Sequence, residues 1–281
     1  PVTVVHLTTA HPSLDTRIFH KICVTLAQRG YNVILMEPHD CQETIRGVRI
    51  YPLPKRVGQS RLLRFMHSWI DGARAVIHTR AAIVHIHDPE LIPLGLVFRM
   101  IGFHVIYDVH EDLPRQTMSK EYIPRSIRRI VSWLCSLIET MAGTWMSGII
   151  AVTPVIARRF PQRKTVTVHN FPILNELSTV SPVPHRMRDP VFAYVGGITA
   201  IRGIREMIQA IAQVKYAGVT MKLAGDFTPA NLKDEIMSLP GWKQIEFLGW
   251  LPRQQIADTL SQARAGLVLL HPTLNYLDSY P

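Results

Sequence analysis

Apolar residues along the chain gather in short continuous runs, separated by stretches in which they recur every three to four residues. Residues 2–8 form a β-branched apolar run, and Asp15 is a suitable N-cap for a helix that Gly30 ends. A second apolar run follows at 31–36. A strand, a helix and a strand in such close succession predict a parallel βαβ unit with a right-handed crossover.

The same alternation continues through the first part of the chain. Apolar runs predict further strands at 82–86, 103–109 and 148–152, and helical spacing predicts helices at 89–101 and 125–146. Strands with so few polar residues suit a sheet that helices cover on both faces. The first part is therefore predicted to be a doubly wound α/β domain.

A change of composition predicts a second domain. Residues 178–190 carry three prolines and few apolar side chains, which is typical of a linker, so we expect domains at 1–177 and 191–281. The second domain also alternates, with strands predicted at 191–195, 219–224, 245–248 and 266–270 and helices at 203–214 and 252–262. It is shorter than the roughly 150 residues of a usual nucleotide-binding half, so we expect it to be incomplete.

The composition excludes several classes of protein. Of the 281 residues, 47% are apolar and 19% are charged, which argues against a disordered chain, collagen or a coiled coil. The formal net charge of +10 favours phosphate-bearing partners such as nucleotides, nucleic acid or anionic lipid. Residues 115–164 hold nine lysines and arginines against two glutamates, a local charge of 9 − 2 = +7.

The cellular compartment is predicted from the cysteines and from the start of the chain. Cys23, Cys41 and Cys135 are odd in number and widely spaced, which indicates neither a disulfide framework nor a zinc ribbon. No secretory signal opens the chain, and the weakly charged stretch 130–150 contains a glutamate and three serines, so it is not expected to span a membrane. We predict a cytoplasmic protein.

A glycine loop lies at the junction of a predicted strand and helix in the second domain. Residues 194–203 read Tyr-Val-Gly-Gly-Ile-Thr-Ala-Ile-Arg-Gly. Glycines let backbone amides approach a ligand and a helix N-terminus favours negative charge, so a diphosphate could bind here with Arg202 as its cationic partner. The pattern fits a tight turn with a solvated arginine equally well. No dinucleotide fingerprint follows the first strand.

Two polar clusters follow strands of the first domain, at 85–90 and at 107–114. In a parallel sheet both clusters, with Asp15 and Arg17 after the first strand, belong to the carboxyl edge where open α/β sheets bind ligands. His85 and His87 would share one face, but we expect no third fixed ligand and hence no metal site. For His85 a structural role is favoured.

Six segments of the chain, in this order, resemble a known enzyme family. They are 6–19 (which includes HLT and HPSLDTRIF), 87–93 (HDPELIP), 107–114 (YDVHEDLP), 169–172 (HNFP), 196–203 (GGITAIRG) and 247–249 (FLG). The set is similar to that of the nucleotide-sugar-dependent glycosyltransferases of family 4. The resemblance covers nearly the whole chain. It implies a GT-B architecture, in which two Rossmann-like α/β domains face a cleft, with the second domain incomplete here.

The resemblance also implies roles for particular residues. The second domain would bind a UDP-, GDP- or other nucleoside diphosphate sugar, and the first domain would bind the acceptor. The residues expected to bind the donor are Gly196, Gly197, Arg202, Gly225, Gly249 and Trp250. The residues expected to bind the acceptor are Asp15, Arg17, His87, Asp88, Glu90 and Glu111. His110 matches the family histidine that faces the transferred sugar, and Asp278 matches the first of two acidic residues. Gly197 stands where many members carry an arginine.

The expected activity follows from this resemblance. A hydroxyl would attack the sugar with retention of configuration, while cationic and amide groups stabilise the departing diphosphate in place of a metal or cofactor. The second acidic residue would lie beyond Pro281, so these 281 residues could be inactive. Alternatives are a sugar-nucleotide epimerase and a non-enzymatic acceptor-domain binding module. Nucleic-acid binding is not expected, since no recognition motif is found.

The basic stretch suggests one further partner. Arg125, Arg128, Arg129 and Trp133 could rest on an anionic membrane that presents a lipid-linked acceptor, which would place the protein on the cytoplasmic face of the inner membrane. A core helix with a solvated basic end explains the same pattern.

Overall fold

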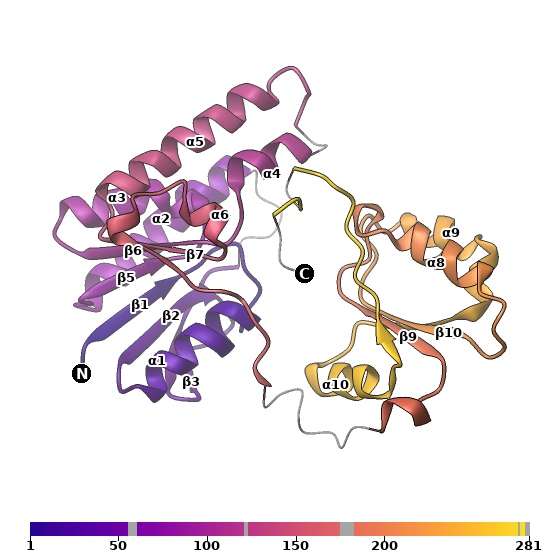
Figure 1. Cartoon of the computed structure of the whole chain (residues 1–281). Helices are drawn as coiled ribbons and strands as arrows, with labels where there is room; N and C mark the ends of the chain where they lie inside the picture. Colours follow the sequence, from indigo (N-terminus) through magenta and orange to yellow (C-terminus); the bar gives the residue numbers. More distant parts are fainter. Residues whose placement is uncertain (56–60, 121–122, 175–182, 275, 279–281) are drawn as a thin grey trace. The chain divides into compact units, whose positions relative to one another are not determined.

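The computed structural model describes residues 1–55, 61–120, 123–174, 183–274 and 276–278 (Figure 1). The chain forms two compact units, Pro1–Asn170 (unit 1) and Phe171–Ser279 (unit 2). Residues 178–182 of the predicted linker lie outside the described residues, and His185–Met187 within it form one 3₁₀ turn, η4.

Unit 1 is built on an eight-stranded sheet in the order β3-β4-β2-β1-β5-β6-β7-β8. All neighbouring strands are parallel except β3 and β4. The strands are β1 (Thr3–Leu7), β2 (Asn32–Pro38), β3 (Glu43–Ile45), β4 (Val48–Leu53), β5 (Ile83–Ile86), β6 (His104–Val109), β7 (Gly148–Ala151) and β8 (Thr165–Thr167). The chain order reverses on either side of β1, which places a topological switch point between β1 and β5.

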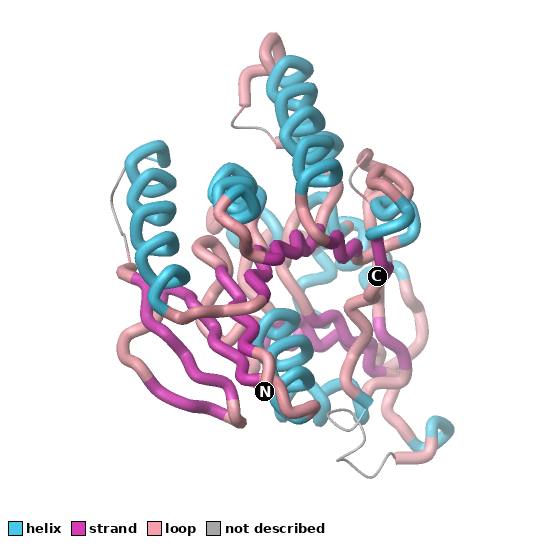
Figure 2. The backbone as a smooth tube through the Cα atoms, turned by 90° about the vertical axis from the view of Figure 1, so that its left-hand side faces the viewer, coloured by secondary structure: helices cyan, strands magenta, loops and turns pink. Residues whose placement is uncertain are grey.

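Helices connect these strands, as the alternation of colours in Figure 2 shows. They are η1 (Thr16–Cys23), α1 (Val24–Gln28), α2 (Arg61–His78), η2 (Pro89–Leu91), α3 (Ile92–Met100), α4 (Leu113–Ser119), α5 (Arg128–Trp145), α6 (Pro154–Ala157) and η3 (Gln162–Lys164). The carboxylate of Asp15 accepts bonds from the amides of Arg17 and Ile18, which confirms the predicted N-cap.

Two apolar clusters lie on opposite faces of the sheet. Along β2, Ile34 and Met36 belong to one cluster, whereas Val33 and Leu35 belong to the other, because successive side chains of a strand point to opposite faces. The first cluster packs under α2, α3 and α5, and the second under η1 and α1. The predicted doubly wound α/β organisation is therefore confirmed.

Several elements of unit 1 have no counterpart in the prediction. The hairpin of β3 and β4 turns through Arg46 and Gly47, both with positive φ, +52° and +81°. This geometry fits a two-residue hairpin turn, but arginine is an uncommon residue at positive φ and so gives no turn signal. Helices α2 and α4 and strand β8 were also not predicted.

Unit 2 contains a four-stranded parallel sheet in the order β11-β10-β9-β12. Its elements are β9 (Val191–Val195), η5 (Ala200–Arg202), α8 (Ile204–Gln213), β10 (Thr220–Ala224), α9 (Leu232–Met237), η6 (Pro240–Gln244), β11 (Ile245–Gly249), α10 (Arg253–Gln262) and β12 (Ala265–Gly266). The strand predicted at 266–270 is wrong in its extent, because β12 covers only Ala265–Gly266. The amides of Arg264 and Leu267 donate to β9 carbonyls, and the ladder ends there.

Among the described residues, no helix combines the length and the apolar composition that crossing a bilayer requires.

Candidate functional site

Polar side chains gather at the carboxyl ends of β1, β5 and β6, beside the switch point of the unit 1 sheet. His6 on β1 lies directly opposite His85 on β5, and Asp108 is on the neighbouring strand β6. The amide of His87 extends the pairing by donating to the Leu7 carbonyl at 3.1 Å. Residues from three separate parts of the chain are thereby placed side by side, as the sequence predicted for this edge.

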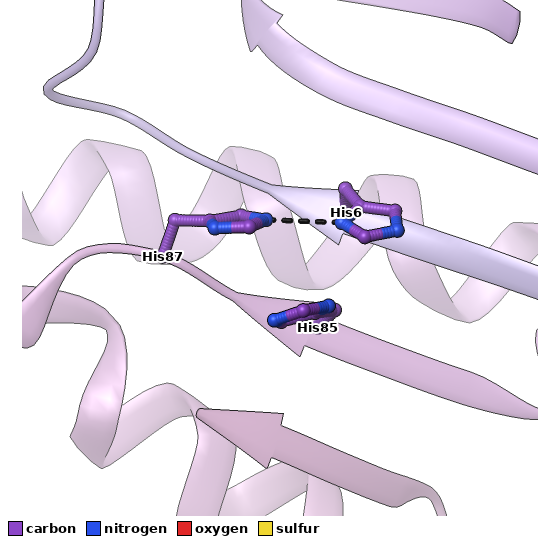
Figure 3. A group of neighbouring side chains, drawn as sticks. All are labelled: His6, His85 and His87. Atoms are coloured by element: carbon purple, nitrogen blue, oxygen red, sulfur yellow. Dashed lines mark hydrogen bonds between the residues drawn. The ribbon is translucent and has the colours of Figure 1, made fainter. Parts of the chain in front are cut away.

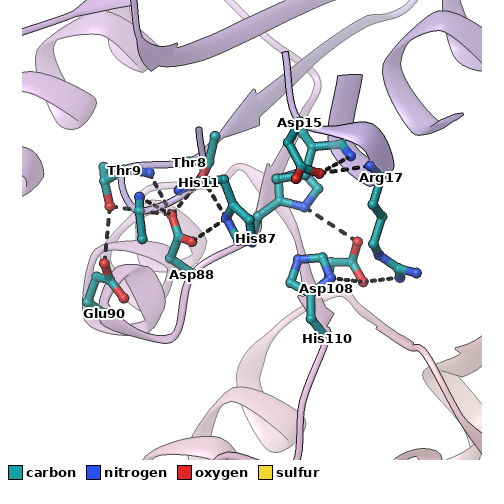
Figure 4. Close-up of polar contacts among 12 residues, drawn as sticks. Thr8, Thr9, His11, Asp15, Arg17, His87, Asp88, Glu90, Asp108 and His110 are labelled. Carbon is teal, nitrogen blue, oxygen red and sulfur yellow. Dashed lines mark hydrogen bonds and ion pairs between the residues drawn. The ribbon is translucent and has the colours of Figure 1, made fainter. Parts of the chain in front are cut away.

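Asp88 holds the loop that follows β1. Its carboxylate accepts bonds from the Thr8 hydroxyl at 2.9 Å and from the Thr9 amide at 2.6 Å, and it pairs with His11 at 2.8 Å (Figure 4). Burial alone would raise the pKa of Asp88, but these bonds, that from His11 above all, keep it below its ordinary value. Asp88 therefore anchors a loop of the site.

Arg17 is bound within unit 1. Its guanidinium donates to Asp108 at 2.8 Å and to the Val168 carbonyl at 3.3 Å, and only 7% of the residue is exposed. Burial favours the protonated form of Asp108, yet His87 and His110 beside it hold the pKa of this carboxyl well below its usual value. A buried arginine and a buried aspartate thus neutralise each other beneath the site.

Three buried histidines, His6, His85 and His87, lie next to one another (Figure 3). Nδ1 of His6 and Nε2 of His87 are 3.0 Å apart, and the rings of His85 and His87 are stacked at 4.5 Å. Burial, together with the neighbouring histidine rings, lowers the pKa of His85 to about 3 and that of His87 to about 4. The cluster is therefore neutral at physiological pH.

Three histidines, rather than the predicted two, meet at this edge of the sheet. We expected no third fixed ligand beside His85 and His87, but His6 provides one, and the ligand atoms of the three histidines lie within 4.8 Å of one another. His87, Asp108 and His110 form a second such group. His85 Nε2 has no hydrogen-bond partner among the described residues, so its expected structural role leaves one nitrogen unsatisfied. That the protein uses no metal stays a prediction.

His110 follows β6 and faces an open pocket. Its ring stacks on His87 at 5.7 Å and meets His11 edge-on at 5.2 Å. Burial lowers the pKa of His110, and neither ring nitrogen has a hydrogen-bond partner in the described part of the chain. Both nitrogens are buried, and Nδ1 lies 3.9 Å from the Asp108 carboxylate.

The pocket has a volume of about 830 Å³, which suits a small-molecule ligand. Five of the predicted residues line it, namely His87, Asp88, Glu90, His110 and Glu111. Asp15 and Arg17 are not among its lining residues, since one caps η1 and the other pairs with Asp108. Desolvation raises the pKa of Glu111, so this carboxyl binds a proton more readily than usual.

Three glycines stand at adjacent strand ends in unit 2. Gly196 follows β9, Gly225 follows β10 and Gly249 ends β11, and the Gly225 amide donates to the Gly249 carbonyl at 2.8 Å. Gly225 has φ +140°, and a Cβ there would lie 1.9 Å from the Gly196 carbonyl oxygen. Only glycine allows the two strand ends to approach so closely.

The predicted phosphate loop is present in part. The amides of Gly196 and Ile198 donate to the carbonyls of Ala224 and Asp226. These two amides are therefore already hydrogen-bonded within unit 2 and are not available to a phosphate. Around Gly197 the position of a Cβ has no atom within 4 Å. The Arg202 guanidinium lies against Gly196, and although burial opposes it, bonding with Tyr194 and Tyr276 raises the pKa of Arg202. A cation thus stands beside an open glycine backbone.

Two other predicted residues of unit 2 lie at the surface. Trp250, directly after β11, is 70% exposed, and Asp278 is exposed in a turn formed by residues 276–278.

Comparison with protein families identifies the chain. Residues 16–173 match the family described as the glycosyl transferase 4-like domain. The chain belongs to this family. The matched residues include the whole of the histidine-lined pocket of unit 1 apart from its β1 loop, so most of the pocket lies within the glycosyl transferase 4-like domain, whereas His6, Thr8 and His11 precede it.

Solved structures show the same fold. Sucrose-phosphate synthase from Thermosynechococcus elongatus superposes with a TM-score of 0.72 at 14% identity, over 95% of this chain and 75% of that one. WaaG, a glycosyltransferase involved in lipopolysaccharide biosynthesis, gives 0.69 at 14% identity over 97% and 75%. Anabaena HepE in complex with UDP-glucose gives 0.65 at 14% identity over 94% and 72%. The GT-B fold inferred from the resemblance is confirmed. No curated protein sequence matches the chain significantly.

The sequence interpretation missed three residues that build this site. Thr8 and His11 hold Asp88, and His6 completes the histidine cluster, but the sequence interpretation gave none of them a role. The available signal for His6 and Thr8 was alternation, because the strand predicted at 2–8 places them two residues apart and so on one face. The register that sets His6 against His85 is a property of the folded sheet alone.

Proposed function

We propose that the protein transfers a glycosyl group from a nucleoside diphosphate sugar to a hydroxyl of a saccharide or lipid-linked glycan, with retention of configuration. The observation that carries this proposal is the pocket of the glycosyl transferase 4-like domain, which is lined at the sheet edge by His110, Glu90 and Glu111. Carboxylates and neutral imidazoles are suitable partners for sugar hydroxyls. UDP-glucose in the HepE complex, a protein of the same fold, supports a nucleotide sugar as donor.

In the proposed reaction the acceptor oxygen forms a bond to the anomeric carbon. The bond between that carbon and the diphosphate oxygen breaks, and the nucleoside diphosphate leaves with the electron pair. The hydroxyl proton passes to the departing phosphate. Arg202 and the open backbone at Gly197 would stabilise the developing charge on the diphosphate, and Gly225, Gly249 and Trp250 would lie toward the nucleoside. Asp278 would be the second catalytic residue, beside the transferred sugar.

The role proposed for His110 follows from its protonation state. Because burial keeps the imidazole neutral, His110 would contact the transferred sugar without adding positive charge beside the oxocarbenium-like centre. His87, Asp88, Asp15 and Arg17 would support the acceptor side by holding the pocket wall and its loops.

Nucleoside diphosphate release tests the proposal. Purified protein is incubated with UDP- and GDP-sugars and with a panel of saccharides, and the product linkage is determined by NMR. We expect His110→Ala to lower turnover at least ~100-fold, as loss of a positioned polar group does. His104→Ala is the matched control, because His104 is exposed at the other end of the same strand. Equal turnover in both variants would contradict the role of His110.

Two outcomes would replace the proposal. Conversion of the donor sugar without acceptor would indicate an epimerase, and donor binding without any reaction would indicate a binding module. The proposed chemistry needs no metal, so transfer should persist in the presence of a chelator. Activity that disappears with chelator and returns with a divalent cation would contradict this part.

Helix α5 supports the proposal that unit 1 rests on a membrane surface. Trp133, Ile130 and Trp145 are about 60% exposed, and Arg125 and Arg129 are exposed near its first turn. Arg128 is used internally, since its guanidinium donates to the Ile123 carbonyl at 2.7 Å. Apolar and cationic side chains together are typical of interfacial helices. Flotation with anionic and neutral vesicles tests this, and binding that is absent or unaffected by Trp133→Ala would contradict it.

A further inference from the structure

The pocket at His110 continues into an apolar groove between α4 and α5, which lie side by side (Figure 1). Its far wall is a stripe along α5 made of Ile127, Val131, Cys135 and Ile138. Ile127 and Ile138 are 11 positions apart, so the stripe is about 16 Å long at a helical rise of 1.5 Å per residue. Leu113 closes the groove on the α4 side.

The two ends of the cavity differ in chemistry. Asp88, Glu90, His110 and Glu111 line the end at the sheet edge, where hydroxyl groups can be bound. The groove has an apolar wall along α5, and on the α4 side Gln116, Thr117 and Lys120 line it together with Leu113. Ile127 is 44% exposed and Ile138 is 37% exposed, although both are apolar. Apolar surface left open and continuous with a polar site is typical of a binding groove rather than of a packed core.

We infer that the groove binds the hydrocarbon chain of an acceptor glycoside whose sugar lies at His110. This inference rests on the proposed function, and it decides between the two acceptor classes, because a free saccharide has no group that would fill the groove. Carboxylates and imidazoles at the polar end suit a neutral sugar, and the stripe on α5 suits an alkyl or isoprenoid chain. The acceptor is therefore an amphiphile.

Cys135 makes the inference testable without knowledge of the natural acceptor. It lines the groove and is partly exposed, with its sulfur 3.8 Å from the Thr117 hydroxyl. Cys41 is exposed elsewhere in unit 1 and serves as an internal reference. The probe is octyl β-glucoside below its micelle concentration, with methyl β-glucoside as the control that lacks the chain. Alkylation of each cysteine by N-ethylmaleimide is followed by peptide mass spectrometry.

We expect octyl β-glucoside to slow alkylation of Cys135 while Cys41 reacts unchanged. Each methylene that enters the groove gains about fourfold in affinity, so the half-protecting concentration should be at least ~10-fold lower than that of methyl β-glucoside. Equal protection by both glucosides, protection of neither cysteine, or equal slowing of both cysteines would overturn the inference.

A pair of double variants locates the effect. Ile127→Gln with Ile138→Gln removes apolar surface inside the groove, whereas Ile130→Gln with Leu137→Gln removes exposed apolar surface of α5 outside it. We expect only the first pair to weaken binding of octyl β-glucoside, by ~10-fold or more in calorimetry. Calorimetry does not depend on the reactivity of Cys135. An equal loss in both variants would assign binding to the outer face of α5 and overturn the inference.

The outcome is independent of the proposed function, because neither measurement uses a donor or turnover. If the protein transfers sugar but octyl and methyl glucosides bind equally, the function stands and the groove inference fails. If octyl β-glucoside binds in the groove but no transfer occurs with any donor, the groove stands and the proposed function fails.

Discussion

The buried histidines of unit 1 predict a steep loss of stability in mild acid. His85 and His87 are almost completely buried, and in the folded protein burial and the neighbouring histidine rings lower the pKa of the first to about 3 and of the second to about 4. In the unfolded chain both return to the ordinary value of 6.5. His6, His110, Asp108 and Arg17 surround the pair, and His6 and His110 shift in the same direction.

The sign of the effect follows from proton uptake. Below pH 6.5 the unfolded state binds protons that the folded state excludes, so the free energy of unfolding falls as the pH falls, until the folded pKa values are reached. Lowering the pH from 7 to 5 costs about 2 kcal/mol for each histidine at 1.36 kcal/mol per pH unit, so the pair costs about 4 kcal/mol. This is a large part of a typical stability of about 5–15 kcal/mol.

Urea unfolding at pH 7 and at pH 5, followed by far-UV circular dichroism, measures the loss. His85→Leu removes one of the two titrating groups, so its loss between the two pH values should be about 2 kcal/mol smaller than that of the unsubstituted protein. Comparison with the unsubstituted protein cancels the contribution of unit 2. Val84→Ala on the same strand is the control, because a cavity lowers stability by the same amount at both pH values. Losses that agree within ~0.5 kcal/mol for the His85→Leu variant and the unsubstituted protein would refute the reasoning.

Three further substitutions give expected changes in stability. Asp108→Asn leaves the buried Arg17 without its counter-charge and should cost about 3–5 kcal/mol in urea unfolding, and a cost below 1 kcal/mol would contradict the buried pair. Gly225→Ala drives a Cβ into a facing carbonyl and should lower the melting temperature at least twice as much as Gly249→Ala, where a Cβ meets nothing within 4 Å; equal shifts would contradict the close approach. Asp15→Ala removes two bonds to the first turn of η1 and should cost about 1 kcal/mol, and an unchanged stability would show that the cap is dispensable.

The predicted phosphate loop, residues 194–203, shows how much the local sequence could predict. A strand, two glycines and an arginine predicted the position of a loop beside β9, and the structure places Arg202 against Gly196 there. The sequence could not show which amides are available, because the partners of Gly196 and Ile198 come from β10 and the residue that follows Gly225. Backbone amides that seem available to a ligand from the local sequence can instead donate hydrogen bonds to a neighbouring strand or loop.

Local pattern and composition by themselves determined the alternation of strands and helices, the cap at Asp15 and the grouping of polar residues at strand ends, because these depend on side chains a few positions apart. Only the tertiary structure decided that His6 completes the histidine cluster, that Arg17 pairs with Asp108, and that α4 and α5 enclose an apolar groove. Each of these joins residues far apart along the chain. Such contacts are set by strand register and helix packing, which arise only when the whole sheet and its covering helices form together.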